Sequence, residues 1–259
     1  MIMTMTMTTV IIMTTTVRIM VITMTERTTA MLTADGLYQL MAWLSPAFPV
    51  GGYSYSHGIE TAVERGVVND RETLGTWIGG ILSFGAGATD ALLFRAAHAA
   101  LSDKEIAHAI ELGDAWRGSA ELAHESAAQG DAFLAAAYKS WPLPAIWQVR
   151  FVADAIQRPV AYAVAVGAAT RALPLELALS AYLQAMAANL VSAGVRLIPL
   201  GQTDGQITIA ALASVVARTV ATACEGSLDD LTRRLGSAAA EVDLTSMQHE
   251  TQYTRLFRT

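Results

Sequence analysis

The chain has 259 residues, of which 53% are hydrophobic and only 15% are charged, with 17 Lys and Arg against 23 Asp and Glu. So apolar a chain can bury enough surface to fold, which excludes disorder over most of its length. The net charge of −6 and the lack of a basic run argue against nucleic acid as a partner. The single cysteine, Cys224, excludes an internal disulfide and a cysteine-based metal centre, and it fits a reducing cytosol.

The first 24 residues differ from the rest of the chain, because 15 of them are apolar, 8 are Thr and one is Arg. They lack the basic start, the leucine-like apolar stretch and the small-residue cleavage site of a signal peptide. We therefore expect residues 1–30 to form a low-complexity, disordered extension, with the functional chain starting at Met24.

Most of the chain after residue 30 has the pattern of helices separated by short breaks, without sustained strand-like alternation. Asn69 with Glu72, and Ser102 with Glu105, have the spacing of capping boxes at helix starts. The predicted helices, in chain order, span residues 36–44, 56–65, 70–84, 89–101, 103–116, 119–138, 145–157, 159–171, 175–197, 204–224 and 227–234.

The longest uncharged stretch, 19 residues between Glu176 and Arg196, lies in the predicted helix 175–197. It approaches the roughly 20 residues that span a bilayer, but its polar residues and abundant Ala are also typical of a helix at the centre of a bundle. We favour a single-domain, all-α helical bundle over residues 31–240, built around this buried central helix and followed by a tail at 241–259. A small helical membrane protein is the alternative.

The common catalytic motifs are absent from the sequence. There is no P-loop and no nucleophile elbow. Neither His-Glu pair forms a zinc-binding HExxH helix, because Ala128 follows His124, and Tyr253 follows His249, at the fourth position. The five His residues are scattered along the chain, so we expect no stable metal site and a protein that is not an enzyme.

Three stretches break the Ala-rich and Leu-rich pattern. The first, residues 45–60 (SPAFPVGGYSYSHGIE), combines prolines and paired glycines with polar aromatic and charged residues. Such a loop offers Tyr53, Tyr55, His57 and Glu60 for contacts with a partner. The alternative is a rigid connector between two helices.

The second stretch, residues 189–206 (NLVSAGVRLIPLGQTDGQ), leads out of the predicted central helix through a Pro-Leu-Gly turn. Asn189 needs hydrogen-bond partners if it is buried. Gln202 and Gln206 could line a polar surface or a passage. The alternative is that Asp204 caps a helix and that the glutamines are merely solvated.

The third stretch is the carboxyl terminus, residues 246–259 (SMQHETQYTRLFRT). Burial of Tyr253, Leu256 and Phe257 would stabilise it by about 5–8 kcal/mol, whereas ordering residues 241–259 costs about 1 kcal/mol per residue or more. We therefore expect a tail that stays mobile until a partner holds it, since Tyr, Phe and Arg are common interface anchors. A frayed terminus without a role is the alternative.

These three stretches resemble sequence blocks of the UreF family of urease accessory proteins. Residues 45–60 are similar to the family's SPxxPxGxxSYSxGxE block, residues 195–206 to its VRLxPLGQTxGQ segment, and residues 249–258 to its closing HETQYxRLFR. The resemblance covers about residues 33–259, with Thr259 in place of the usual Ser, and residues 1–30 have no counterpart in it.

The resemblance implies an all-α, non-catalytic, cytoplasmic protein that forms a homodimer. Members of the family bind UreD, called UreH in some organisms, recruit the GTPase UreG, and help deliver nickel to apo-urease. Nickel would then pass in transit without a stable site, GTP would be bound by UreG, and neither nucleic acid nor a membrane would be a partner.

The motif match also implies roles for individual residues. The expected partner-binding residues are His249, Glu250, Thr251, Gln252, Tyr253, Arg255, Leu256, Phe257 and Arg258 in the tail, with Tyr53, Tyr55, His57 and Glu60 in the first block. The expected nickel-passage or UreG-facing residues are Asn189, Arg196, Gln202, Asp204 and Gln206. An alternative function is that of a strict GTPase activator that supplies an arginine finger to UreG, although none of the 15 Arg is singled out for it.

Overall fold

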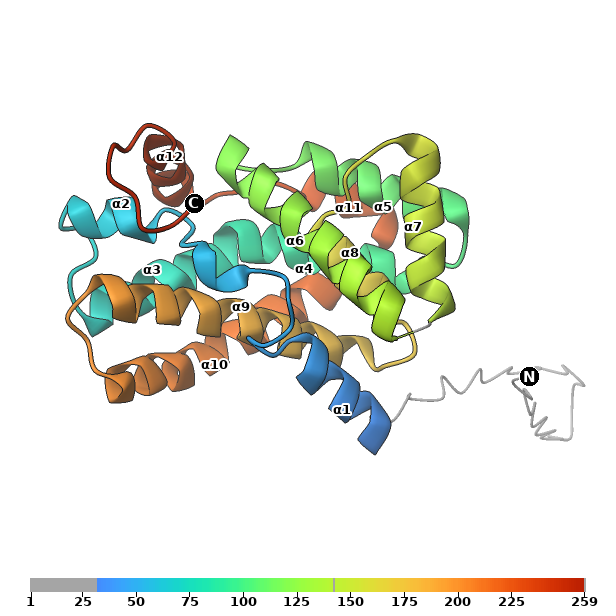
Figure 1. Cartoon of the computed structure of the whole chain (residues 1–259), viewed down its shortest axis with the longest axis horizontal. Coiled ribbons are helices and arrows are strands. Elements are labelled where there is room, and N and C mark those ends of the chain that lie inside the picture. Colours follow the sequence, from blue (N-terminus) through green and yellow to red (C-terminus); the bar gives the residue numbers. More distant parts are fainter. Residues whose placement is uncertain (1–31, 142, 259) are drawn as a thin grey trace, which may run out of the picture.

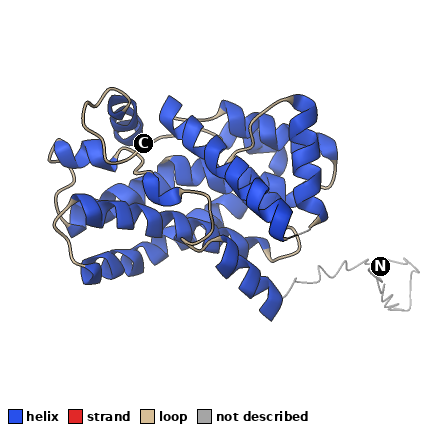
Figure 2. Cartoon of the chain, viewed as in Figure 1, coloured by secondary structure: helices blue, strands red, loops and turns tan. Residues whose placement is uncertain are grey.

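The computed structural model describes residues 32–141 and 143–258, and every regular element in these ranges is a helix (Figures 1 and 2). The elements are α1 (Ala34–Trp43), η1 (Gly52–Ser54), α2 (Ile59–Glu64), α3 (Arg71–Phe84), α4 (Ala86–Ala99), α5 (Asp103–Ala115), α6 (Ala120–Ser140), α7 (Pro144–Ile156), α8 (Tyr162–Ala169), α9 (Leu175–Leu197), α10 (Gln202–Cys224), η2 (Leu228–Asp230), α11 (Leu231–Arg234) and α12 (Ala240–His249). The all-α prediction is confirmed. The extension predicted at residues 1–30 lies outside the described residues.

The helix starts follow local sequence signals. The capping box at the start of α5 forms as predicted: the Glu105 N–H donates to Ser102 Oγ at 3.3 Å, and the Ser102 N–H donates to Glu105 Oε2 at 2.9 Å. The capping box predicted at Asn69 is wrong by one residue. Here the Thr73 N–H donates to Asp70 Oδ1 at 2.8 Å, and the Asp70 N–H donates to Thr73 Oγ1 at 3.1 Å. Asn and Asp are comparable caps, so sequence alone does not separate them.

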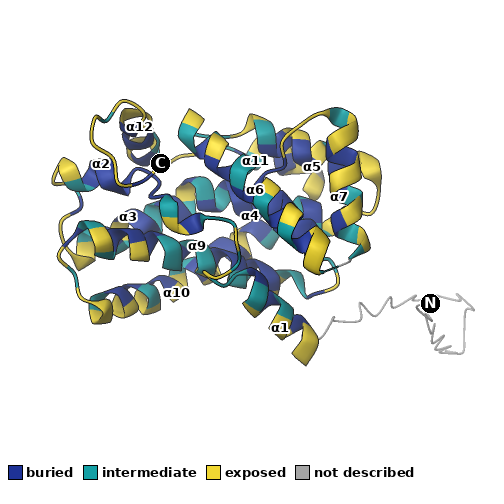
Figure 3. Ribbon diagram, in the orientation of Figure 1, coloured by how far each residue is buried: buried dark blue, intermediate teal, exposed yellow. Residues whose placement is uncertain are grey.

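The most enclosed element is the short helix α8, in which every residue from Ala163 to Ala169 is buried. Helices on the outside of the bundle, such as α10, have one buried and one exposed side (Figure 3). Helix α8 packs against α4 and α6. Glycine allows the close approach to α4, because a Cβ at Gly167 would lie 2.5 Å from the carbonyl oxygen of Phe94. The prediction that the helix at 175–197 is the buried centre of the bundle is therefore wrong, and α8 takes that place.

The helix at 175–197, α9, lies in a layer with α3, α4 and α10 (Figure 1). Its Leu179, Leu183 and Leu190 are buried, while Gln184 and Ser192 on its other side are exposed. The uncharged run made α9 look buried all round because Ser, Gln and Ala carry no charge even where they face solvent. The eight residues of α8 are too short a run to stand out in the same way.

Three helical stretches are long and apolar enough to cross a membrane, judged by length and composition: Arg71–Ala99, Leu175–Leu197 and Gln202–Cys224. The sequence analysis singled out only the second of these, because a count of uncharged residues stops at single charges such as Arg218. Within the fold, 67%, 50% and 33% of the most apolar part of these stretches is buried, respectively. Much of their apolar surface therefore serves the packing of the bundle, and α10 is the least covered of the three.

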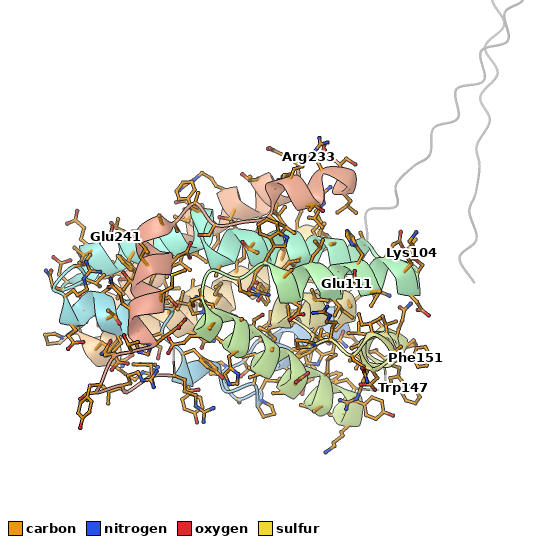
Figure 4. The ribbon with its side chains drawn as sticks, turned by 90° about the horizontal axis from the view of Figure 1, so that it is seen from above. Lys104, Glu111, Trp147, Phe151, Arg233 and Glu241 are labelled. Atoms are coloured by element: carbon orange, nitrogen blue, oxygen red, sulfur yellow. The ribbon has the colours of Figure 1, made fainter. Side chains whose placement is uncertain are left out.

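The two ends of the molecule differ in character. Helices α2 and α12 lie together at one end, and α1 and α7 lie toward the other (Figure 1). Figure 4 shows Glu241 of α12 far from Trp147 and Phe151, two exposed aromatic side chains on the outer side of α7.

Candidate partner-binding site

The three unusual stretches of the sequence meet at the end of the molecule that carries α12. Arg196, in the last turn of α9, donates from Nη2 to the Tyr53 carbonyl oxygen at 2.7 Å. Its guanidinium group lies 4.5 Å from the centre of the Phe257 ring, a cation–π contact. The Arg258 N–H donates to the Ser54 carbonyl oxygen at 2.8 Å. One arginine therefore joins the loop before α2, the end of α9 and the carboxyl-terminal segment.

Two glycines let the loop approach α9 closely. Gly51 has a left-handed backbone with φ of 73°, a conformation that side chains disfavour. A Cβ at Gly52 would lie 2.8 Å from Nδ2 of Asn189 on α9. The Gly51–Gly52 pair thus provides both the positive φ and the close backbone approach that the sequence suggested, at successive positions.

Glu60, at the start of α2, is the principal anchor of the carboxyl-terminal segment. Its buried carboxylate accepts the Leu256 N–H at 2.7 Å and the Phe257 N–H at 3.0 Å. The same carboxylate lies 3.2 Å from Nε2 of His249. Hydrogen bonds to a charged acceptor are stronger than those between neutral groups, so a single side chain fixes the backbone at two tail positions and contacts the ring at a third.

His249 connects Glu60 to a second carboxylate. The ring is fully buried, and its Nδ1 lies 2.8 Å from Oε2 of Glu121 on α6. Glu121 Oε1 in turn accepts from Nη1 of Arg255 at 2.9 Å. A continuous polar chain therefore runs from α2 through α12 to α6 and back to the tail.

The expectation that the tail is mobile in the isolated chain is contradicted here, because residues 240–249 form α12 and the following residues pack on α2 and α6. Ser246 Oγ of α12 lies 2.7 Å from Ser119 Oγ. The free-energy comparison failed because it counted three apolar side chains and no buried polar contacts. Of those three, only Phe257 is buried, with 4% of its surface exposed, whereas Tyr253 and Leu256 point into solvent.

The residues predicted to bind a partner thus fall into two sets. The buried set holds the tail and the loop in place and comprises Tyr55, His57, Glu60, His249 and Phe257. The exposed set can contact another protein and comprises Tyr53, Glu250, Thr251, Tyr253, Arg255, Leu256 and Arg258. Gln252 is half-buried, and its Oε1 accepts from Thr61 Oγ1 at 2.6 Å. We refer to the exposed set as the tail surface.

The tail surface has the features of a preformed interface. Tyr53 and Leu256 expose 69% and 76% of their surface, and Tyr253 is fully exposed. The buried set holds the backbone beneath them, so a partner would order only side chains, which lowers the entropic cost of association. Exposed Tyr and Arg beside apolar Leu are the residue types that dominate binding energies at interfaces.

The segment at the start of α10 lies apart from this cluster. Gln202 and Gln206 are exposed, and Asp204 is half-buried. The Gly201 N–H donates to Asp204 Oδ2 at 3.2 Å, and Asp204 forms a 3.5 Å ion pair with Arg71 of α3. Asp204 therefore supports the start of α10, as in the capping alternative, although the helix begins two residues earlier than predicted.

A cavity of about 80 Å³ with polar and apolar walls lies beneath the loop of residues 45–57, between α4, α6, α8 and α9. Two charged pairs line it: His57 with Glu125, at 3.0 Å, and Arg117 with Asp90, at 2.7 Å. Tyr182 donates from its hydroxyl to Asp90 Oδ2 at 2.7 Å. Asn189 also borders the cavity, so one of the residues expected at a passage does line an internal space.

The charges in the cavity change the protonation of their neighbours. Burial alone would lower the pKa of His57, but the charge and the hydrogen bond of Glu125, with a smaller contribution from Asp90, raise it above its usual value. Burial and the Asp90 charge raise the pKa of Tyr182 well above its usual range. The Tyr182 hydroxyl therefore keeps its proton and donates a hydrogen bond to Asp90.

The sequence analysis missed several members of these networks. Asp90 is the single carboxylate in the largely apolar helix α4, and a carboxylate among apolar residues signals a buried ion pair. Glu121 and Glu125 are four residues apart on α6, so they share one face. Glu121 meets the tail and Glu125 meets His57. Spacing could have paired these carboxylates, but only the fold reveals their partners.

Among the described residues, no group of three or more His, Cys, Asp or Glu side chains is arranged to hold a metal ion.

Known proteins match most of this chain. A family model described as UreF matches residues 68–213. The urease accessory protein UreF of Granulibacter bethesdensis is 48% identical over 231 residues, which cover 86% of this chain and 93% of that protein. The chain belongs to the UreF family. The UreF proteins of Rhodopseudomonas palustris strains BisB5 and HaA2 are 46% and 44% identical, over 86% and 91% of this chain and 90% and 100% of their own lengths.

Membership of the UreF family gives the chain an accessory role in urease maturation and not a catalytic one. The resemblance seen in three short blocks of sequence is thereby confirmed over most of the chain. The UreF assignment also implies that the chain works with other components of urease maturation, and the tail surface is the described feature best suited to hold one of them.

Proposed function

We propose that the chain is a non-catalytic scaffold for urease maturation that binds UreD, or UreH where that name is used, through the tail surface. The observation that carries this proposal is the convergence of three separated sequence blocks on one rigid, partly apolar surface. Arg196 links the blocks, and Glu60 fixes the backbone of the tail. Tyr53, Tyr253 and Leu256 remain free for a partner.

The scaffold would bring together a GTPase and an apo-enzyme. We assign the exposed first turn of α10, with Gln202 and Gln206, as the surface for UreG, because it is polar and separate from the tail surface. GTP stays in UreG, and nickel is cargo that passes in transit to apo-urease. The molecule acts in the cytoplasm as a homodimer, which would cover part of its apolar surface.

The test is urease maturation in cells that co-express the full set of accessory proteins. The double variant Tyr253→Ala/Leu256→Ala removes two exposed side chains without touching the buried anchors. We expect it to lower the urease nickel content and activity at least tenfold, since loss of two interface anchors weakens binding by about 2 kcal/mol or more. Leu101→Ala, at an exposed position between α4 and α5, is the matched control and should leave maturation intact. Normal maturation with the double variant would contradict the proposal.

A membrane-bound role is the second possibility, since three helical stretches have suitable length and apolarity. The first of them carries Asp90, whose carboxylate is satisfied inside the fold by Arg117 and Tyr182. Such internal pairing is expected both in a soluble bundle and in a membrane-spanning one. Fractionation of the full chain without detergent separates the two, because a spanning protein would stay with the membranes.

A further inference from the structure

Two buried cationic side chains in the cavity beneath residues 45–57 each leave one nitrogen without a partner. Nη2 of Arg117 and Nδ1 of His57 are buried and accept or donate no hydrogen bond within the described structure. Both side chains are more than nine-tenths buried. A buried donor without an acceptor destabilises the fold, so two of them beside one cavity indicate a missing acceptor.

The charges around the cavity limit what this acceptor can be. Arg117 is paired with Asp90, and His57 with Glu125, so the opposite charges are balanced before any ligand enters. The free nitrogen of Arg117 carries N–H groups and no lone pair, so it cannot coordinate a metal ion. An anion that enters this site adds negative charge to balanced pairs and loses its hydration. Both costs are larger for a divalent anion than for a monovalent one, so a monovalent anion fits better.

The size and the rim of the cavity fit a small solute. Its volume of about 80 Å³ exceeds the space that one water needs. Pro46 and Tyr53 line it and are exposed elsewhere on their surface, so the cavity reaches solvent beside the loop. Gln129, whose Nε2 donates to Glu125 at 2.8 Å, closes its inner side.

The backbone that places His57 here is unusual. His57 has a positive φ of 51°, which non-glycine residues disfavour. Such strain persists where the surrounding structure enforces it, and it clusters at ligand sites. The result is that a loop residue reaches the cavity wall beside Glu125 of α6.

We propose that this cavity binds a small monovalent oxyanion of the carboxylate or bicarbonate type, which accepts hydrogen bonds from Arg117 Nη2 and His57 Nδ1. The site is independent of the tail surface and of the proposed role in maturation. Arg117 also borders a second cavity on the α12 side, but the Asp243 carboxylate lines that space and disfavours an anion there.

The experiment is a titration of the full chain with sodium formate, and separately with bicarbonate, at constant ionic strength, followed by the backbone amide resonances of residues 51–58 and by calorimetry. We expect saturable formate binding in the wild type. Arg117→Lys keeps a cation for Asp90 but removes the second N–H, and His57→Asn retains a residue that tolerates a positive φ. Each should weaken binding about tenfold, the effect of losing one charge-assisted hydrogen bond.

Arg171→Lys is the matched control, because Arg171 also has a buried, unpartnered Nη2 but does not line this cavity. It should leave formate binding unchanged, and sulfate should bind at least tenfold more weakly than formate. Absence of saturable binding, equal binding of sulfate, or insensitivity to His57→Asn would each overturn the proposal. Should Arg117→Lys unfold, the His57→Asn titration decides alone.

Discussion

Glu60 shows how one side chain can fix a whole segment. Its carboxylate accepts two successive backbone N–H groups, those of Leu256 and Phe257, and contacts the buried ring of His249. The motif HETQYTRLFR alone does not predict that Glu60 binds it, because Glu60 is 189 positions before His249. The chemistry of the arrangement is that of an anion held by backbone donors.

We predict that Glu60→Gln loosens the tail without unfolding the bundle. The neutral amide accepts weaker hydrogen bonds than the carboxylate, so the amide protons of Leu256 and Phe257 should exchange about tenfold to a hundredfold faster. Hydrogen-exchange mass spectrometry of the carboxyl-terminal peptide measures this. Glu64→Gln, at an exposed position of the same helix, is the control. Unchanged exchange in the Glu60 variant would show that the carboxylate is not the anchor.

His57 makes a pH-dependent contribution to stability. Glu125 raises the pKa of His57 in the folded chain despite burial, which lowers it, whereas in the unfolded chain the pKa returns to about 6.5. The folded state therefore binds the proton more tightly. Its contribution is fully present below about pH 6.5 and is lost as the pH rises through the raised folded value.

His57→Asn should therefore reduce the free energy of unfolding more at about pH 6 than at about pH 9. Urea unfolding of both proteins at both pH values gives the four free energies, and effects that do not depend on pH cancel in the comparison. Asp90, Arg117 and Glu125 face the same site and are common to both proteins. A loss that is equal at the two pH values, or larger at the higher one, would refute this account of His57.

At the scale of elements, the docking of α12 depends on a single glycine. Gly58 has φ of 75°, and a Cβ there would lie 2.9 Å from the backbone nitrogen of Ser246 on α12. Helix α12 can therefore approach α2 only where this position lacks a side chain.

Gly58→Ala should destabilise the protein by clearly more than Gly66→Ala. Gly66 has nearly the same φ, 72°, but a Cβ there would meet no atom within 4 Å. Both variants bear the left-handed strain of about 1–2 kcal/mol, and only the first adds a clash with α12. Thermal unfolding and proteolysis at α12 compare them. Equal destabilisation by the two variants would mean that α12 is not packed against Gly58.

The helices before α12 could be predicted from the sequence to within a few residues, because capping residues, prolines and glycines act locally, whereas α12 lies in the stretch predicted to be a mobile tail. Ser102 with Glu105 is such a signal, and it is realised in the structure. The enclosure of α8 and the amphipathic nature of α9 could not be predicted in this way, because the burial of a helix depends on which other helices pack on each of its sides. The polarity of each residue is known from the sequence, but which polar residues face solvent depends on the fold.

The site was predictable in part for the same reason. The three blocks were recognisable as unusual, and their convergence follows from long-range packing that no block encodes alone. The mobile tail was wrongly predicted because its stabilisation comes from Glu60 and Glu121, which lie outside it. Apolar anchors are visible in a sequence, whereas buried polar partners become visible only in the fold.

At the scale of the whole molecule, the UreF-family chain is a helical bundle that presents the exposed side chains of the tail surface at one end. The tail surface lies at the end formed by α2 and α12 (Figure 1). Tyr253 and Leu256 are exposed there because the polar chain through His249 holds the backbone. The central claim is that UreD meets the molecule at this surface.

The most direct test is a hydrogen-exchange and carboxyl- and tyrosine-labelling footprint of the full chain with and without UreD. Our account predicts protection at Tyr53 and at residues 250–258 when UreD is added. The backbone amides of α7 around the exposed Trp147 and Phe151, far from α12 (Figure 4), should exchange at unchanged rates in the same sample. Protection confined to α7, or anywhere that leaves Tyr53 and the tail fully reactive, would contradict the account.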